Sequence, residues 1–331
     1  MGFGDLRGIL QYVPQFQNKT FVIAIDGAVV DSDVFSNLLL DIAVLQSLSV
    51  RIVLVHGAGH QIRELGAQRN VPISSDDGRG VTDEATFDVS LDAITHLNFS
   101  ILRQLAGVRL RAAAVNVIHG HSVGVVKGVD QQLTGSVSWV DTDAILSMLD
   151  SKMIPVLSPT VITSTGNTLR VNSDAVGRKV ASALKADKLI FLCGSSVPML
   201  TPERRHLAVA MADTEALAEK MDDAWATRLE NARRACENGV ARAHFLNGME
   251  NDALLAEVFS NEGVGLMVFS DDYLRVRPLE GKDVPDLLSM IRNSVADDAL
   301  VDRSPEEIFS RIDEYFVIEV DGNLVGSVAL Y

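Results

Sequence analysis

Two segments of the chain have the composition of an anion-binding turn. Residues 21–27 read FVIAIDG and residues 51–59 read RIVLVHGAG, so each is an apolar run that ends in small residues. The apolar runs predict buried strands, and the residues after them predict a tight turn into a helix. Gly57 and Gly59 would let backbone N–H groups approach an anion at the N-terminus of that helix. Both segments therefore predict the phosphate-cradling corner of an α/β domain.

A second group of residues has the chemistry to recognise an amino acid. His244 and Glu257 are followed closely by Gly263 and Gly265. A carboxylate such as that of Glu257 can pair with a guanidinium, and glycines permit backbone carbonyl and N–H groups to approach an α-amino acid. The alternative is a helix with a solvated Glu257, followed by glycines that serve a C-terminal turn.

The elements that must position these residues alternate between strands and helices. Strand patterns occur at residues 21–25, 52–55, 114–118, 154–157 and 189–192, and helical patterns at residues 4–17, 34–47, 83–105 and 173–185. Alternation of this kind implies a mostly parallel sheet with helices on both faces. Beyond residue 270 the pattern changes to strand, helix, a second helix at 305–313 and a hairpin whose turn is Asp321-Gly322.

The composition is that of a globular protein. The residues are 47% hydrophobic and 22% charged. A length of 331 residues is sufficient for two domains with separate cores. Lys+Arg 29 against Asp+Glu 44 gives a net charge of −15, which disfavours nucleic acid and anionic membranes as partners. No apolar run reaches the roughly 20 residues of a membrane span, and no secretory signal is evident at the start. Cys193 and Cys236 lack metal-ligand spacing, so we expect reduced thiols, a cytoplasmic protein and no metal site.

Residues 21–59 resemble the opening of the amino-acid kinase family. In that family the first strand ends in Lys-x-Gly-Gly and the second in His-Gly-Gly-Gly. Here Ala24 stands in place of the phosphoryl-transfer lysine, and Asp26 replaces a phosphate-loop glycine. The resemblance implies a kinase fold, with Gly57 and Gly59 in its second loop, that lacks the cation of the transfer chemistry.

Two further segments resemble the same family, again with changes. Residues 172–174 (NSD) resemble the pattern whose aspartate organises two lysines, although Asp174 is alternatively the N-cap of the following helix. Residues 78–83 (GRGVTD) resemble the Gly-Leu-Arg-Val-Thr-Asp segment of N-acetylglutamate kinases, whose arginine clamps a substrate carboxylate. Alignment puts Gly80 at that arginine and Arg79 on the other side of the backbone. A polar loop that caps the next helix is the alternative interpretation.

Residues 239–265 resemble the arginine-binding end of arginine-sensitive N-acetylglutamate kinases and synthases. The helix expected at 4–17 resembles the N-terminal extension of those proteins, in which a tyrosine packs near arginine and the helices join dimers into hexamers. The resemblance implies an L-arginine site formed by Tyr12, His244, Glu257 and the two glycines, and a homo-oligomer (dimer or hexamer). The alternative is a helix that lies on its own domain.

The end of the chain resembles the first half of a GCN5-related N-acetyltransferase (GNAT) domain. The sequence Leu-Val-Asp-Arg-Ser around Arg303 resembles a motif of bacterial N-acetylglutamate synthases, which implies that Arg303 holds a carboxylate of L-glutamate. Ser304 and Glu307 have the spacing of a capping box. Leu330 and Tyr331 resemble the strand whose backbone lines the glutamate pocket. The segment for acetyl-CoA, the family's co-substrate, and the catalytic groups would follow Tyr331, so we expect these 331 residues alone to be inactive.

Together these resemblances identify the chain as a member of the bacterial N-acetylglutamate synthases, which acetylate L-glutamate at the start of arginine synthesis under feedback by L-arginine. They imply an α/β fold: an amino-acid kinase-like sandwich with a mostly parallel central sheet, plus a truncated α+β GNAT domain. The expected parts are an oligomerisation helix (1–20), a regulatory kinase-like domain (21–270) and the GNAT half (271–331). The alternatives are an N-acetylglutamate kinase and a non-catalytic arginine-sensing pseudokinase.

Overall fold

The computed structural model describes residues 16–201, 206–259, 263–270, 274–296, 303–320 and 323–330. The chain divides into two compact units, Met1–Val268 and Phe269–Tyr331. Tyr12, most of the helix expected at 4–17 and Tyr331 lie outside the described residues. Within the described ranges, no helix has both the length and the apolar character needed to cross a membrane.

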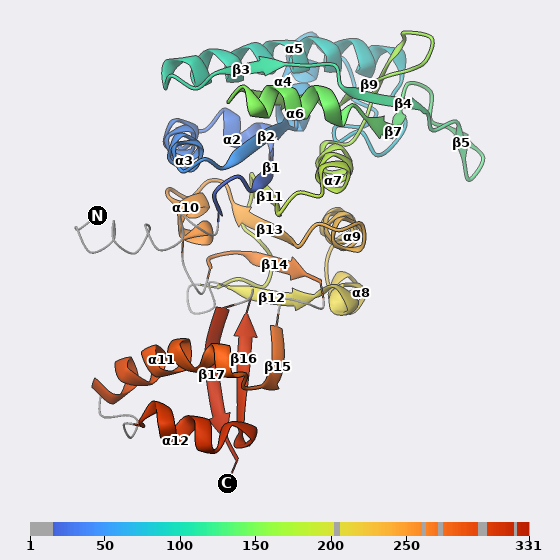
Figure 1. The fold of residues 1–331 in the computed structure, drawn as a ribbon. Helices are drawn as coiled ribbons and strands as arrows, with labels where there is room; N and C mark the ends of the chain where they lie inside the picture. The colour runs from blue at the N-terminus through green and yellow to red at the C-terminus, as the bar shows by residue number, and fades with distance from the viewer. Residues whose placement is uncertain are drawn as a thin grey trace. The chain divides into compact units, whose positions relative to one another are not determined.

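The first unit is built on an eight-stranded sheet (Figure 1). Its strands, in spatial order, are β12 (Leu207–Ala210), β14 (Leu266–Phe269), β13 (Arg242–Asn247), β11 (Lys188–Cys193), β1 (Thr20–Ile25), β2 (Arg51–His56), β8 (Ile154–Leu157) and β3 (Ala112–Ala114). From β13 to β3 every neighbouring pair is parallel, which confirms the predicted mostly parallel sheet. The strands are apolar runs because parallel sheets are covered on both faces.

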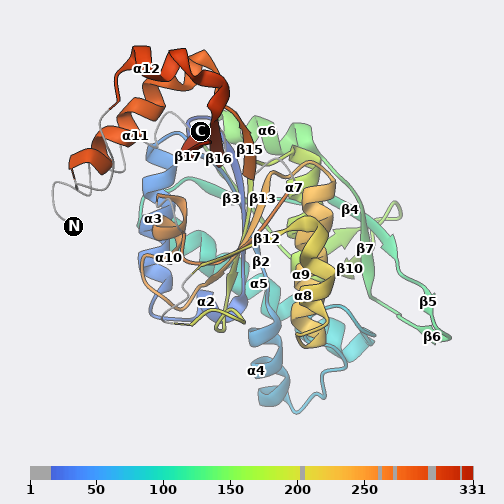
Figure 2. The same cartoon turned by 90° about the horizontal axis from the view of Figure 1, so that it is seen from below.

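Helices cover both faces of this sheet. One core contains side chains of α2 (Gly27–Val30), α3 (Phe35–Ser47), α4 (Gly59–Arg69), α5 (Glu84–Gly107) and α10 (Ala253–Val258). The other contains side chains of α6 (Thr142–Asp150), α7 (Ser173–Leu184), α8 (Thr214–Ala218) and α9 (Asp223–Glu237). Figure 2 shows α3 and α10 on one side of the central strands and α7 and α9 on the other. A short 3₁₀ turn, η1 (Met211–Asp213), precedes α8.

A second, four-stranded sheet extends the α7 side of the unit. Its order is β10 (Thr168–Arg170), β9 (Thr160–Ile162), β4 (Ile118–Ser122) and β7 (Gly135–Val140), with the hairpin β5 (Val125–Val126) and β6 (Val129–Asp130) between β4 and β7 in sequence. The prediction of one strand at 114–118 is wrong. The chain leaves the central sheet after Ala114 and joins the second sheet at Ile118, and an apolar alternation does not reveal where a chain changes sheets.

Side-chain caps begin the helices on which the candidate sites depend. The Asp83 carboxylate accepts a hydrogen bond from the Thr86 N–H at 2.7 Å, so the expected capped loop before α5 is confirmed. At α7 the cap is Asn172, whose Oδ1 accepts from the Ala175 N–H at 3.0 Å. Asp174 is therefore not an N-cap, and that interpretation is wrong; it lies inside the first turn with its carboxylate available for another partner.

The second unit has the predicted order of strand, helix, helix, strand, strand. The elements are β15 (Leu274–Pro278), η2 (Gly281–Asp283), α11 (Val284–Ala296), α12 (Pro305–Ser310), η3 (Ile312–Glu314), β16 (Tyr315–Val320) and β17 (Asn323–Ala329). The three strands form an antiparallel sheet, and Leu287, Ile308 and Val317 are central to a separate core. Ser304 and Glu307 form the predicted capping box before α12.

His56, at the end of β2, makes the stability of the first unit sensitive to acid. The side chain is 1% exposed, and burial lowers its pKa from 6.5 to about 4. The unfolded chain binds a proton near pH 6.5 and the folded chain does not, so the stabilisation is present above pH 6.5 and is lost as the pH falls through 4. We expect the free energy of unfolding to fall by about 3 kcal/mol from this group across that window.

Urea denaturation at pH 7, 6, 5 and 4 measures this dependence. His56→Gln should make the dependence on pH less steep than in the unmodified chain, whatever its effect on stability at pH 7. His60→Gln, a substitution of a half-exposed histidine four residues along, should leave it unchanged. An equal pH dependence in His56→Gln and the unmodified chain would contradict the prediction.

Candidate functional site

A cavity of about 520 Å³ lies at the carboxyl ends of the central strands β1, β2 and β11. Asp26, Gly57 and Gly59 line it from the turns that follow β1 and β2, and Asp174 lines it from α7. Ligands of open parallel sheets bind at this end of the strands. Four of the six residues that the sequence assigned to a degenerate kinase site therefore line this cavity.

The other two, Ala24 and Gly80, are not among the lining residues. Ala24 is 5% exposed and packs in the core, where a Cβ at Gly177 of α7 would lie 3.3 Å from the Cβ of Ala24. In place of Gly80, Arg79 lines the cavity, contrary to the expectation that it lies on the other side of the backbone. Its guanidinium pairs with Asp77 and donates to the carbonyl oxygen of Asp223 at 3.3 Å.

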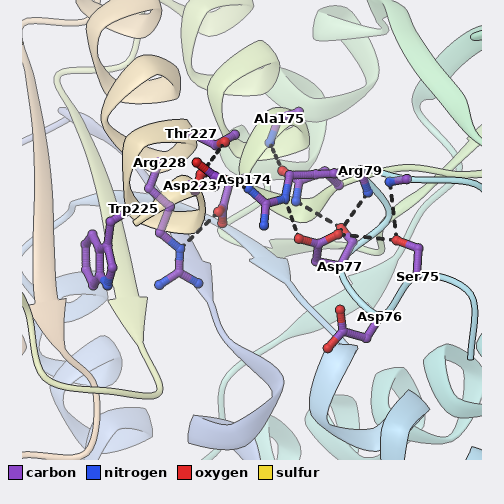
Figure 3. A network of polar contacts seen from close by, with 12 residues as sticks. Ser75, Asp76, Asp77, Arg79, Asp174, Ala175, Asp223, Trp225, Thr227 and Arg228 are labelled. Atoms are coloured by element: carbon purple, nitrogen blue, oxygen red, sulfur yellow. Dashed lines mark hydrogen bonds and ion pairs between the residues drawn. The ribbon is translucent and has the colours of Figure 1, made fainter. Parts of the chain in front are cut away.

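Arg228 of α9 contacts both acidic residues of the cavity. Its Nη2 lies 2.9 Å from Oδ1 and 2.8 Å from Oδ2 of Asp26, and its Nε lies 3.2 Å from Oδ2 of Asp174. The guanidinium carbon lies 5.2 Å from the centre of the Trp225 ring. Figure 3 shows Arg228 reaching from α9 toward Asp174, with Trp225 beside it. Burial raises the pKa of Asp174, the charge of Arg228 opposes that shift, and the charge of Asp26 adds to it.

Every guanidinium that lines the cavity has a partner within the chain. The pairs are Arg63 with Asp76, Arg79 with Asp77, Arg170 with the carbonyl oxygens of Ser75 and Asp76, and Arg228 with Asp26 and Asp174. Figure 3 shows the Asp77–Arg79 pair on the loop that faces Asp174. Among the described residues that line the cavity, each guanidinium is therefore already held by an acceptor of the chain, which weakens its attraction for a transferring phosphoryl group.

Removing Arg228 should destabilise the first unit. The side chains of Arg228, Asp26 and Asp174 are 20%, 26% and 13% exposed, so Arg228→Ala leaves two neighbouring and mostly buried carboxylates unpaired. We expect a loss of about 2 kcal/mol or more in the free energy of unfolding, measured by urea denaturation at pH 7.

Arg233→Ala is the matched control because Arg233 lies on the same helix and pairs only with Glu230 and Glu237 among the described residues. The side chains of Glu230 and Glu237 are 36% and 40% exposed, and ion pairs with exposed partners contribute about 0.5 kcal/mol. Equal losses in the two variants would show that the Arg228 contacts add nothing beyond a surface ion pair.

A second cluster lies on the face of the sheet that α3 and α10 cover, and it consists of Lys188, His244 and Glu257. His244 Nδ1 donates to Glu257 Oε1 at 2.6 Å, and Lys188 Nζ donates to His244 Nε2 at 3.3 Å. The Val264 N–H donates to Glu257 Oε2 at 2.6 Å. Lys188, His244 and Glu257 are 6%, 2% and 6% exposed, so three ionisable groups are buried together. We call them the Lys188 cluster.

Burial controls the charges of this cluster. It lowers the pKa of His244 to about 4, so the imidazole is neutral at pH 7, in the tautomer that donates from Nδ1. It lowers the pKa of Lys188 to about 7. Burial alone would raise the pKa of Glu257, but the hydrogen bonds from His244 and Val264 outweigh this effect and hold the pKa below its usual value. The cluster therefore contains an anion, a neutral imidazole and a lysine whose pKa is lowered to about 7.

The structure brings His244, Glu257 and Gly263 together, as the sequence predicted. Gly263 has φ +73°, and a Cβ there would lie 2.8 Å from Glu257 Oε2. A Cβ at Gly265 would lie 2.4 Å from a methyl group of Leu246 and 3.5 Å from the same carboxylate oxygen. Only glycine fits at these two positions. The glycines therefore let the chain pass against the carboxylate, and the interpretation of Glu257 as a solvated surface residue is wrong.

Sequence reasoning missed Lys188 and Arg228. Lys188 opens the strand KLIFLC, and a lysine at the start of an apolar strand was open to interpretation as solvent-exposed. Its signal is the position directly before a run in which every residue is buried. Arg228 lies in a helix with several other arginines, so nothing in the sequence distinguishes it from surface residues.

Three further side chains approach one another closely enough to share a cation. Among the described residues, ligand atoms of Asp31, His60 and Glu64 lie within 4.8 Å of one another, near the start of α4. They already bond within the chain: the Gln61 amide donates to Asp31 at 2.5 Å, and His60 Nε2 lies 3.3 Å from Glu64.

In the second unit, Arg303 is half-buried and directly precedes the Ser304 cap of α12. Leu330 is 63% exposed, and its N–H donates to the carbonyl oxygen of Glu314 at 2.9 Å. These are the two described residues among the three assigned to the glutamate pocket.

Comparison with known proteins gives the family context. The amino acid kinase family matches residues 19–247. The amino-acid acetyltransferase of Pseudomonas fluorescens is 33% identical over 338 residues, which cover 98% of this chain and 78% of that protein. The amino-acid acetyltransferase of Ralstonia nicotianae is 33% identical, with 98% and 75% covered.

Solved structures agree over both units. The N-acetylglutamate synthase of Neisseria gonorrhoeae, complexed with coenzyme A and L-arginine, has a TM-score of 0.88 at 27% identity over 99% of this chain and 79% of that chain. The same synthase complexed with coenzyme A and N-acetyl-glutamate has a TM-score of 0.77 at 27% identity. Carbamate kinase from Giardia lamblia, at 12% identity and a TM-score of 0.56, shares the fold alone.

Proposed function

Because the chain belongs to the amino acid kinase family over residues 19–247, and to the amino-acid acetyltransferases over 98% of its length, we propose that it serves N-acetylglutamate synthesis under control by L-arginine. The amine of L-glutamate attacks the acetyl thioester, the C–N bond forms and the C–S bond breaks. Catalysis of this step requires positioning, removal of the ammonium proton and polarisation of the thioester carbonyl. The kinase-like unit binds the regulator, and the unit from Phe269 onward takes part in binding L-glutamate.

One observation carries this assignment of roles within the first unit. In the described part of the kinase cavity each guanidinium is paired within the chain, whereas the Lys188 cluster presents a buried carboxylate that still has capacity for a ligand. A carboxylate accepts about four hydrogen bonds, and Glu257 receives two from the described residues. A guanidinium can use the other two as a bidentate pair. The Lys188 ammonium then provides a partner for the α-carboxylate of the same amino acid.

L-Arginine should raise the melting temperature of the chain. A ligand that binds only the folded state adds about 2.7 kcal/mol at a hundred times its dissociation constant. L-Lysine at the same concentration should give a smaller shift because an ammonium cannot make the bidentate pair. Glu257→Gln should abolish the arginine shift, and Glu250→Gln, an exposed glutamate just before the same helix, should retain it.

The melts are followed by circular dichroism at millimolar ligand. The absence of a shift in the unmodified chain would rule out the assignment of the site. A shift that persists in Glu257→Gln would place arginine elsewhere.

Arg303 should bind a carboxylate of L-glutamate in the second unit. Its planar fork forms two parallel hydrogen bonds to a carboxylate, and hydrogen bonds to charged groups contribute about 1.5–3 kcal/mol. Arg303→Ala should therefore weaken L-glutamate binding, measured by calorimetry, by at least about tenfold. Arg311→Ala, an exposed arginine at the end of α12, is the control. Unchanged affinity in Arg303→Ala would remove this residue from the pocket.

The first unit should not phosphorylate N-acetylglutamate. Arg228 is held by Asp26 and Asp174, and position 24 carries an alanine that faces the core. Incubation with ATP, Mg²⁺ and N-acetylglutamate should produce no enzyme-dependent ADP in a coupled assay. Sustained ADP production that disappears on heating the protein would revive the kinase alternative.

A further inference from the structure

We propose that His206 is an additional ligand-binding residue of the Lys188 cluster and that it makes the site select a guanidinium over an ammonium. His206 lies directly before β12, far in sequence from Glu257. The proposal rests on the proposed function of the cluster as an arginine site. It adds a residue that neither the sequence motifs nor the pairs already described include.

The backbone holds His206 beside the glycine loop. The Leu207 N–H donates to the Gly265 carbonyl oxygen at 3.0 Å, which fixes the start of β12 against the loop. A Cβ at Gly263 would lie 2.8 Å from His206 Nδ1 and also 2.8 Å from Glu257 Oε2. The imidazole nitrogen and the carboxylate oxygen are therefore separated by no more than twice that distance, and both lie beside the same glycine.

His206 Nδ1 differs from the other polar atoms of this group because it has no hydrogen-bond partner among the described residues, although the atom is buried. The two Glu257 oxygens have His244 and Val264 as donors. Leaving a buried polar atom unpaired costs about 1–3 kcal/mol. A ligand that donates to Nδ1 recovers this free energy on binding.

The chemistry of the two atoms matches a guanidinium. Neutral imidazole with its proton on Nε2 presents a lone pair at Nδ1, so Glu257 and His206 together present acceptors at two separate places. The guanidinium carries five N–H donors in a planar fork, so one edge can pair with Glu257 while another N–H reaches His206. An ammonium also has three N–H donors, but they diverge from one nitrogen, so it cannot form the parallel bidentate pair with Glu257 while it donates to His206. His206 thus adds to affinity for arginine more than to affinity for lysine.

Calorimetry with L-arginine and L-lysine tests the proposal on the full chain and four variants: His206→Ala, His206→Asn, His60→Ala and Glu257→Gln. We expect His206→Ala to weaken arginine binding about tenfold or more, as loss of one hydrogen bond from a charged donor does. Lysine binding should change less, so the ratio of the two affinities falls. His206→Asn restores an acceptor oxygen and should recover most of the arginine affinity. His60→Ala should match the unmodified chain.

The outcomes separate the two hypotheses. In one outcome the unmodified chain binds arginine, Glu257→Gln does not, and both His206 variants keep the ratio of arginine affinity to lysine affinity. This outcome overturns the role of His206 and supports the arginine site at Glu257. If His206→Ala weakens both ligands equally and His206→Asn does not recover the arginine affinity, His206 acts only on structure and the proposal fails. If the unmodified chain binds no arginine, the proposed function of the cluster fails first.

Discussion

Arg228 joins two carboxylates, Asp26 and Asp174, that are distant in sequence and adjacent in space. The strand order brings them together, because β1 lies beside β11 and α7 precedes β11. Two carboxylates this close and this buried repel each other unless a cation lies between them. The guanidinium also fixes α9 against the ends of the strands, and α9 places Trp225 at 5.7 Å from the Phe245 ring in β13. The ion pairs of Arg228 therefore link α9 to α7 and to the turn after β1, and α9 in turn packs on β13.

Successive side chains of β11 and β13 point to opposite faces of the sheet, so charged residues and aromatic residues of the same strands lie on different faces. In β13, His244 belongs to the Lys188 cluster and the next residue, Phe245, belongs to the core on the α9 side. In β11, Lys188 faces His244 while Phe191 stacks on Phe245 at 4.8 Å. A shift of one residue in the register of either strand would exchange these faces. The parallel pairing of β11 with β13 is thus what places a charged cluster on one side and an aromatic stack on the other.

Most helices and strands can be predicted from the sequence because the spacing of apolar residues and the turn residues are local signals. Sequence patterns alone predict the strands at 21–25 and 52–55, the cap at Asp83 and the order of elements in the second unit. The contacts of the candidate sites are harder to predict, because they join segments that are distant in the sequence. Asp174 has a plausible local role as a cap, and only its contact with Arg228 shows that its partner lies on another helix. Lys188 and His206 resemble surface residues until the strands and the glycine loop enclose them.

The close packing of α7 on β1 restricts which side chains position 24 can hold. The Cβ of Ala24 faces Gly177 with little room to spare, and the surrounding residues Leu189 and Phe191 close the space. A lysine at position 24 would place an ammonium inside an apolar core and push the helix away from the sheet. Arg228 also occupies the carboxylates that such a lysine would need. A lysine at position 24 would therefore need accompanying changes at the α7 contact and at Arg228.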